Sequence, residues 1–319
     1  MTTIGFPSST MPEESRVALL PPELECLVST SPLHFQAEYA KHLGLSDQEY
    51  VQRGAIMVPR MELAQSDILI IPKRDEPDAE LLRRGQTVAG WLYVGQTPWL
   101  YERMSALEIT AVAFEEMCSA GRHVFSDNNF IAGKAGIIDA LEVLEAMVGK
   151  SPKHYQKIAV LGRGTVAKGV FDVLDELGLP YDTFHRTTYG RFFEEISRYD
   201  LIISCIKWDY TGEDFIPKDH VDRMQDGCYV VDLTSEGISG SVPQPIARPT
   251  YRLPTKRGAI HIYNNDHVPT LWPLRASQGI GQALVPILNS FLQGEPSEVI
   301  KRATVLDKGK PTGVQKFQF

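Results

Sequence analysis

Short apolar runs alternate with helix-like stretches along the first 127 residues. Strand-like runs occupy Thr3 to Phe6, Ser66 to Pro72 and Thr87 to Val94, while Phe35 to His42 and Asp78 to Arg84 have helical composition. Strands that alternate with helices are typical of a mostly parallel sheet. This pattern predicts an α/β domain in the first part of the chain.

A second alternating region follows a long helical pattern. Asn128 to Lys150 has apolar residues at helical spacing and no proline, so we expect one long helix there, ended by Pro152. Apolar runs at Leu201 to Ile206 and Cys228 to Leu233 continue the alternation over a region of dinucleotide-binding size. Ser277 to Leu292 predicts a late helix that returns to the first domain.

These patterns predict two α/β domains with parallel sheets, the second of them a Rossmann dinucleotide-binding domain. Residues 1–127 together with 277–319 would form a substrate (catalytic) domain, and residues 128–276 would bind NAD(P). Two long crossing helices would join the domains, with a cleft between them. The length of 319 residues suits two domains that each bury a core of their own.

Composition narrows the class of protein. Contents of 43% hydrophobic and 23% charged residues exclude disordered and fibrous classes, and a net charge of −8 argues against nucleic acid as the main partner. No apolar run approaches the about 20 residues of a membrane span, and no secretory signal is present, so we expect no membrane partner and a cytoplasmic location. The four cysteines form no CxxC pair, which predicts neither a metal site nor a disulfide framework.

A glycine turn, GRGTVAKG, follows the apolar run Ile158 to Leu161. Gly162 and Gly164 take the first two positions of the dinucleotide fingerprint, and Ala167 takes the third, where alanine is permitted. A strand before the turn and a helix after it are the context that this motif requires, and the helix would offer N–H groups to a pyrophosphate. The residues expected to contact the cofactor here are Gly162, Arg163, Gly164, Thr165 and Val166.

No carboxylate lies where an NAD-binding domain usually places one. The acid that binds the ribose hydroxyls should follow the turn by about 20 residues, and the residue 21 positions after Gly164 is His185. A carboxylate there would repel a 2′-phosphate by about 4 kcal/mol at ~4 Å, whereas His185, Arg186, Thr187 and Thr188 offer a cation and hydroxyl donors. NADPH is therefore favoured over NAD. The alternative is that Arg186 is a solvated surface residue and that the pocket accepts NAD as well.

Eight stretches that span nearly the whole chain carry a family resemblance. In order, they are RVALLP, IIPK, GQTVAGWLYVGQ, GRHVF, NNFIAGKAG, GRGTVAKG, YDLIISCIKWD and NNDHVPTLWPLRAS. Together they resemble the alanine dehydrogenase and transhydrogenase superfamily, which includes saccharopine dehydrogenase, and above all its opine-type enzymes. The opine-type enzyme that the chain resembles most joins pyruvate to the side-chain amine of ornithine or lysine with NADPH. The resemblance implies the two-domain fold and small-molecule substrates, a 2-oxo acid and an amino acid; we also expect a homo-oligomer.

The resemblance places Arg16 on a substrate-binding arginine and Lys73 on a substrate-site lysine. A guanidinium can grip the carboxylate of an oxo acid with two hydrogen bonds, and an ammonium can hold the adjacent oxygen while favouring its departure as water. The alternative for each residue is a solvated cation near the end of a helix or strand, without a role in substrate binding.

Tyr93 stands where the superfamily usually has a catalytic histidine. With a reference pKa of about 10, a phenol is a poor base at neutral pH, so Tyr93 would orient the substrate and donate protons while another group deprotonates the amine. The alternative is a half-buried strand tyrosine without a chemical role.

The loop NNDHVPTLWP resembles a saccharopine dehydrogenase segment that faces the nicotinamide. His267 and Asp266 are therefore candidates for the missing base, with Asp266 also a candidate cofactor contact. A helix-capping or structural histidine is the competing interpretation of His267.

Further candidates follow the strands of the second domain, where loops line the ligand crevice. Glu236 aligns with a family aspartate and would bind the cationic amine or the nicotinamide ribose. Lys207 and Trp208 follow the preceding strand, where the cofactor passes. Arg275 would meet the carboxylate of the second substrate. Asp232 is expected to close its strand as a structural residue.

The preferred hypothesis is an NADPH-dependent condensation of a 2-oxo acid, pyruvate favoured, with an amine such as that of ornithine or lysine. The alternatives are an alanine dehydrogenase-like enzyme that uses ammonia, a saccharopine dehydrogenase-like enzyme that uses 2-oxoglutarate, and a catalytically silent nucleotide-binding protein. Tyr93 in place of histidine counts against ordinary alanine dehydrogenase.

Overall fold

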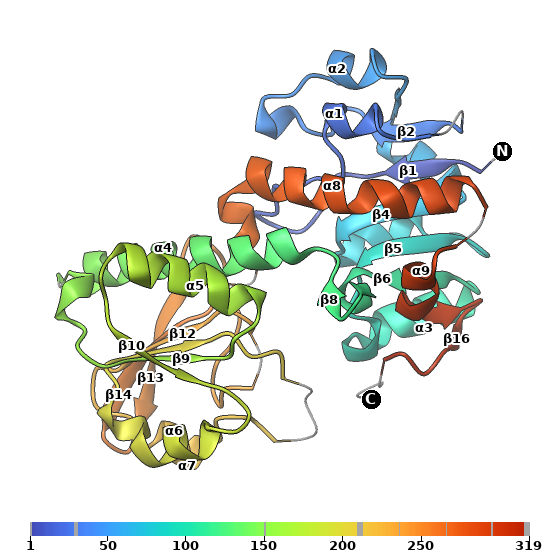
Figure 1. The fold of residues 1–319 in the computed structure, drawn as a ribbon. Coiled ribbons are helices and arrows are strands. Elements are labelled where there is room, and N and C mark those ends of the chain that lie inside the picture. Colours follow the sequence, from blue (N-terminus) through green and yellow to red (C-terminus); the bar gives the residue numbers. More distant parts are fainter. Residues whose placement is uncertain are drawn as a thin grey trace. The chain divides into compact units, whose positions relative to one another are not determined.

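The computed structural model describes residues 2–28, 31–149, 151–208, 213–235, 237–265, 267–294 and 296–315. The chain divides into two compact units. Unit 1 combines the residues up to Ser126 with those from Pro273 onward, and unit 2 is the continuous segment Asp127–Trp272 (Figure 1).

Unit 1 is built on an eight-stranded sheet with the order β16-β15-β6-β5-β4-β1-β2-β3. Its strands are β1 (Ile4–Phe6), β2 (Leu33–Gln36), β3 (Ile56–Val58), β4 (Ile68–Lys73), β5 (Thr87–Trp91), β6 (Thr110–Ala113), β15 (Thr304–Asp307) and β16 (Lys310–Pro311). The strands from β1 to β6 pair in parallel, while β15 is antiparallel to both β6 and β16. The helices and the small hairpin are α1 (Pro21–Leu24), α2 (Asp47–Val51), α3 (Pro98–Ala106), α8 (Pro273–Leu292), α9 (Glu298–Ala303), β7 (Cys118–Ser119) and β8 (Arg122–His123). The 3-10 helices of this unit are η1 (Lys41–Leu43), η2 (Arg60–Gln65), η3 (Glu76–Leu81), η4 (Val94–Gln96) and η5 (Phe114–Glu116).

Apolar side chains cover both faces of this sheet, as a largely parallel sheet requires. Because successive strand residues point to opposite faces, Ile68 and Ile70 of β4 join one cluster with α8, whereas Leu69 and Ile71 join another with α3. The continuous apolar run of β4 is explained by this burial on both sides.

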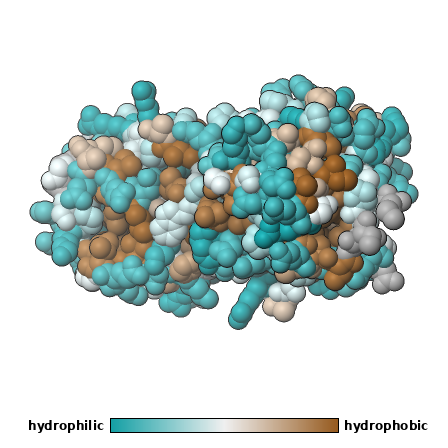
Figure 2. All heavy atoms as spheres, turned by 90° about the horizontal axis from the view of Figure 1, so that it is seen from above, coloured by the Kyte–Doolittle hydropathy of each residue, from teal (hydrophilic) through white to brown (hydrophobic). Residues whose placement is uncertain are grey.

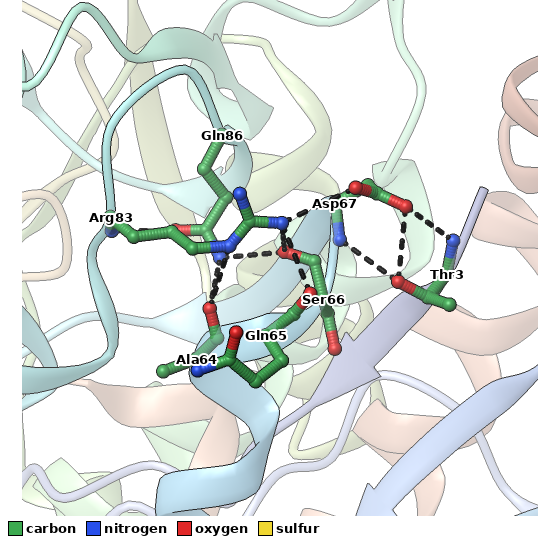
Figure 3. A network of polar contacts seen from close by, with 7 residues as sticks. All are labelled: Thr3, Ala64, Gln65, Ser66, Asp67, Arg83 and Gln86. Atoms are coloured by element: carbon green, nitrogen blue, oxygen red, sulfur yellow. Dashed lines mark hydrogen bonds and ion pairs between the residues drawn. The ribbon is translucent and has the colours of Figure 1, made fainter.

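A polar network joins the amino ends of β1, β4 and β5 (Figure 3). Asp67 accepts hydrogen bonds from the backbone N–H of Thr3 (2.9 Å) and from its hydroxyl (3.1 Å), and it pairs with Arg83 (3.2 Å). Arg83 also donates to carbonyl oxygens at the end of η2, those of Ala64, Gln65 and Ser66. The pKa of Asp67 is lowered, mainly because its carboxylate accepts a hydrogen bond from the backbone N–H of Thr3.

Three local predictions in unit 1 were wrong. The region predicted as a helix from Phe35 to His42 is instead the end of β2, a turn and the start of η1. Because β2 is hydrogen-bonded to β1 and β3 on both sides, sheet pairing overrides local composition there. In the region from Asp78 to Arg84, the predicted helix is only the end of the short 3-10 helix Glu76–Leu81. The strand predicted to reach Val94 ends at Trp91.

Unit 2 contains a six-stranded sheet with the order β10-β9-β11-β12-β14-β13. Its strands are β9 (Ile158–Leu161), β10 (Tyr181–Phe184), β11 (Leu201–Ser204), β12 (Tyr229–Asp232), β13 (Thr250–Thr255) and β14 (Gly258–Tyr263). All pairs are parallel except the β13–β14 hairpin. Its helices are α4 (Ser126–Val148), α5 (Thr165–Glu176), α6 (Tyr189–Glu195) and α7 (Lys218–Val221), with the 3-10 helices η6 (Pro152–His154), η7 (Ile196–Arg198) and η8 (Val268–Leu271).

The helices cover both faces of this sheet, α4 and α5 on one side and α6 and α7 on the other (Figure 1). The crossing of α4 and α5 depends on a glycine from each helix. A Cβ atom on Gly133 would lie 1.9 Å from the carbonyl oxygen of Val166, and one on Gly169 would lie 2.3 Å from that of Phe130. The two backbones therefore meet at a distance that no larger residue allows.

The surface seen in Figure 2 is mainly hydrophilic, with smaller apolar areas between the polar side chains. Cys205 and Cys228 are buried in unit 2. Within the described ranges, none of the helices is long and apolar enough to cross a membrane.

Candidate functional site

The glycine turn of unit 2 connects β9 to α5 with an open backbone. Gly162 has φ +106°, a value that favours glycine, and a Cβ atom there would lie 3.0 Å from the carbonyl oxygen of Cys205. Gly164 immediately precedes α5, is exposed, and has no described atom within 4 Å of the position of a Cβ. This arrangement leaves room for a pyrophosphate at the amino end of a 12-residue helix.

The tip after β10 lies beside this turn. The backbone N–H of Gly162 donates to the carbonyl oxygen of Phe184 (2.8 Å), the residue before His185. His185 and Thr188 close the tip, because the hydroxyl of Thr188 accepts from the N–H of His185 (2.9 Å) and the N–H of Thr188 donates to its carbonyl oxygen (2.7 Å). Arg186 and Thr187 are exposed on this turn. The structure thus brings the two predicted cofactor segments together.

A second cation, Arg191 of α6, also lies at this tip, although it was not predicted. Its guanidinium carbon is 5.0 Å from the ring centroid of Phe184. Its position after the tip, within the first turn of a helix, is a signal that a search for phosphate-binding residues could have used.

Lys207 and Trp208 leave the same edge of the sheet, because Ser204 of β11 pairs in register with Leu161 of β9. Lys207 is exposed, and the indole N–H of Trp208 donates to the carbonyl oxygen of Glu213 (2.9 Å). Both predicted residues therefore follow a strand that adjoins the glycine turn.

Asp232 at the end of β12 is fully buried and is bound by its own loop. Its carboxylate accepts from the N–H of Ser235 (2.9 Å) and from the hydroxyl of Ser241 (2.6 Å). Burial is the main cause that raises the pKa of this carboxyl group. These contacts suit the structural role expected for Asp232.

The remaining predicted residues are distributed over both units. Glu236 and Asp266 lie outside the described residues. His267 is buried at the start of η8, where its carbonyl oxygen accepts from the N–H of Thr270 (3.0 Å), and its side chain does not cap that helix. Arg275 is exposed near the start of α8 in unit 1.

Arg16 in unit 1 is buried and ion-paired, with 5% of its side chain exposed. Its Nε and Nη2 atoms donate to the carboxylate of Glu14 at 2.8 and 2.5 Å, and the Glu14 side chain is wholly inaccessible to solvent. The guanidinium carbon lies 5.5 Å from the ring centroid of Trp91, a cation–π distance. The Nε–Nη2 side of the guanidinium is therefore engaged by Glu14, a partner that the sequence analysis did not consider.

The two residues that follow Arg16 are held by hydrogen bonds to other parts of unit 1. The N–H of Val17 donates to the hydroxyl of Ser277 on α8 (2.9 Å), and the N–H of Ala18 donates to the phenol oxygen of Tyr39 (2.9 Å). The position of Arg16 is thus set by the returning helix as well as by its own loop.

Lys73 and Tyr93 lie together at the carboxyl ends of β4 and β5. Lys73 ends β4 and pairs in register with Trp91, and its ammonium nitrogen is 5.5 Å from the ring centroid of Tyr93. The hydroxyl of Ser9 donates to the carbonyl oxygen of Lys73 (2.8 Å). Since Trp91 also contacts Arg16, one sheet edge gathers the three predicted residues Arg16, Lys73 and Tyr93.

Tyr93 does not lie on a strand. Its backbone has φ 47° and ψ 44°, the left-handed conformation that is unfavourable for a bulky residue and that is maintained where the surroundings impose it. Glu115, after β6, accepts from the backbone N–H groups of Tyr93 (2.7 Å) and Leu92 (3.2 Å). Desolvation is the main cause that raises the pKa of Glu115. Glu115 is a site residue that the sequence analysis missed.

Residues 5–149 match the family described as alanine dehydrogenase/PNT, N-terminal domain. The match includes Arg16, Lys73, Tyr93 and Glu115, so it covers the polar sheet edge of unit 1.

Curated relatives extend the similarity beyond the residues that match this family. An N(5)-(carboxyethyl)ornithine synthase of Lactococcus lactis subsp. lactis is 26% identical over 324 residues, which cover 96% of this chain and 99% of the relative. A saccharopine dehydrogenase [NAD(+), L-lysine-forming] of Yarrowia lipolytica is 27% identical over 51% of this chain and 48% of its own length. These similarities confirm the predicted resemblance and the prediction of an amino acid oxidoreductase.

The fold also agrees with a solved structure. The structure of an L-alanine dehydrogenase superposes with a TM-score of 0.80 at 18% identity and covers 99% of both chains. This likeness confirms the predicted α/β fold of two domains with mostly parallel sheets.

Proposed function

We propose that this protein is an NADPH-dependent oxidoreductase that condenses a 2-oxo acid, with pyruvate favoured, with the side-chain amine of an amino acid such as ornithine or lysine. The observation that carries the proposal is the gathering of Arg16, Lys73 and Tyr93 at one sheet edge. The similarity to N(5)-(carboxyethyl)ornithine synthase over 96% of the chain supports the same reaction.

The reaction needs a carboxylate-binding cation and a proton donor near the ketone. Arg16 would bind the carboxylate of the oxo acid, while Glu14 holds its Nε–Nη2 side. Lys73 would donate a proton to the ketone oxygen as the amine nitrogen adds to the carbon, and the resulting hydroxyl would leave as water with the second proton that the nitrogen gives up as the imine forms. Tyr93, beside that ammonium, would orient the same oxygen through its phenol.

The second substrate must lose a proton before its nitrogen can attack. His267 would accept it, while Glu236 would hold the cationic amine or the nicotinamide ribose and Arg275 the amino acid carboxylate. When bound, NADPH supplies the hydride that reduces the imine carbon, and a proton on the nitrogen completes the secondary amine. Binding the reactants in one orientation supplies much of the rate, because their encounter is entropically costly.

The cofactor assignment rests on the edge of unit 2 that the glycine turn shares with the tip after β10. The open backbone at Gly164 fits a pyrophosphate. Arg186 at the tip and Arg191 against Phe184 supply positive charge for a 2′-phosphate where an NAD-binding domain has a carboxylate. Lys207, Trp208 and Asp266 would line the path of the cofactor.

A matrix of oxo acids against amines, run with NADPH and with NADH, tests the proposal. The expected result is loss of NADPH absorbance with pyruvate plus ornithine or lysine, and a secondary amine in the product by mass spectrometry. Lys73→Met should lower turnover by about 100-fold or more, as removal of a proton donor does, and Lys41→Met, on the exposed η1, serves as control. No turnover with any pair would overturn the proposal.

The main alternative is reductive amination of pyruvate by ammonia. The likeness to the L-alanine dehydrogenase structure, with a TM-score of 0.80, favours a shared fold. Tyr93 at the position expected for a histidine argues against that reaction, because its phenol is a weak base at neutral pH. The ammonia column of the same matrix decides between the two.

A further inference from the structure

The left-handed turn at Tyr93 is held by more than its own neighbours. The hydroxyl of Thr97 donates to the carbonyl oxygen of Tyr93 (2.9 Å), and the guanidinium of Arg74 donates to that of Leu92 (3.0 Å). With the two N–H groups bound by Glu115, donors and acceptors fix both sides of the turn. Such bracing is what an unfavourable backbone conformation needs in order to persist.

Gln315, which follows β16, completes this bracing from a distant part of the sequence. Its side-chain oxygen accepts from the backbone N–H of Gly95 (3.1 Å), which lies 220 positions earlier. Its side-chain nitrogen donates to Glu115 (2.9 Å) and to Glu116 (3.2 Å). An amide side chain can accept from a backbone N–H and donate to two carboxylates at the same time, because it carries an acceptor oxygen and two N–H donors.

We infer that Gln315 is a positioning residue for Tyr93. It holds Gly95 directly and Glu115 through its carboxylate, and these two contacts fix the turn that places the phenol 5.5 Å from the ammonium of Lys73. The inference rests on the proposed function, because Tyr93 acts on the substrate only if that function is correct. Loss of the amide would leave the buried N–H of Gly95 without its acceptor and Glu115 with one donor fewer.

The test compares Gln315→Ala and Gln315→Glu with the wild-type protein. Glutamate keeps the shape of glutamine, yet when ionised it cannot donate and it adds charge beside Glu115 and Glu116. Gln48→Ala, on the exposed surface of α2, is the matched control. Thermal unfolding identifies any variant that fails to fold, and the second variant then carries the comparison.

Three measurements separate the inference from the proposed function. Hydrogen exchange of the peptide that contains residues 92–97 should become about 10-fold faster in both Gln315 variants, since local opening follows the loss of the hydrogen bonds. Turnover with pyruvate and the accepted amine should fall about 10-fold to 100-fold, as small displacements of reacting groups cause, while the affinity for NADPH stays within about 2-fold. Tyr93→Phe, measured in parallel, shows whether the phenol takes part.

Each outcome decides one of the two claims. Unchanged exchange in both variants, while Tyr93→Phe is impaired, overturns the role of Gln315 and leaves the proposed function standing. Faster exchange with undiminished turnover, while Tyr93→Phe is impaired, also overturns the role of Gln315. The hydrogen bonds of Gln315 then have no effect on the phenol. Faster exchange with no effect of Tyr93→Phe rejects the chemical role of Tyr93 itself, and the positioning role with it.

Discussion

The backbone N–H of Gly162 donates a 2.8 Å hydrogen bond to the carbonyl oxygen of Phe184, and this bond places the glycine turn next to the tip that carries Arg186. A pyrophosphate at the turn would therefore direct the adenosine ribose toward that tip. The preference between NADPH and NADH should depend on the charge of the tip.

Arg186→Asp should weaken NADPH binding by about 10-fold or more and change NADH binding little, because a carboxylate repels the 2′-phosphate that NADH lacks. Titration of each cofactor by fluorescence measures both affinities. Arg198→Asp makes the same charge change on an exposed residue that pairs with Glu195, and it should leave both affinities nearly unchanged. Equal losses for the two cofactors in Arg186→Asp would contradict the assignment.

Gly169→Ala should lower the free energy of unfolding by about 1–3 kcal/mol, because the added methyl group overlaps the carbonyl oxygen of Phe130. Gly190→Ala in α6 is the matched control, since no described atom lies within 4 Å of its Cβ position, and there alanine should be neutral or slightly stabilising. Urea unfolding of the two variants measures the difference. Similar stability of both would show that α4 and α5 can separate at no cost.

Glu14→Ala and Arg16→Ala should each lower the free energy of unfolding by about 3–5 kcal/mol, because each leaves the partner's charge buried and uncompensated. The double variant should lose much less than the sum, and a double-mutant cycle by urea unfolding gives the coupling. Strictly additive losses would mean that the two side chains do not form a pair in solution.

Asp67→Asn should make unfolding less dependent on pH in the acid range. The pKa of Asp67 is lowered in the folded chain, so its stabilising effect is complete above its unfolded pKa of about 3.9 and is lost as the pH falls through the folded value. The variant should therefore be less stable than the wild type at pH 7 and approach it near pH 3. Asp307→Asn, an exposed carboxylate at the end of β15, provides the reference curve for urea unfolding. A constant difference across the pH range would refute the predicted linkage.

The elements predicted correctly from the sequence are those whose side chains are buried in the core. The runs that became β4, β9 and β11 are apolar on both faces, and α4 has a long apolar period, so burial alone defines them. The hairpin of β13 and β14 was missed, because β13 is an edge strand without a fully buried residue and its pattern resembles a loop. The turn at Tyr93 could not be predicted, since Glu115 and Gln315 impose it from distant positions.

The site was predicted in residue type more than in geometry. Arg16 and Lys73 were identified through family motifs, and the structure places both at the edge that carries Tyr93. The pairing of Arg16 with Glu14 has no strong pattern in the sequence, because two residues of opposite charge two positions apart are common on surfaces. Burial, which a single sequence does not reveal, makes that pair significant.

The pairing of β15 with β6 sets an order of events during synthesis. Thr304 of β15 lies opposite Val112 of β6 in the sheet. The ribosome therefore releases β6 long before β15 exists, and the edge of β6 that will pair with β15 stays open for roughly 10–40 s at the usual rate of translation. Unit 2, a continuous segment, is made within that interval and can fold first. An open apolar edge is prone to association with other chains. A nascent chain of this protein should therefore depend on chaperones until β15 has emerged.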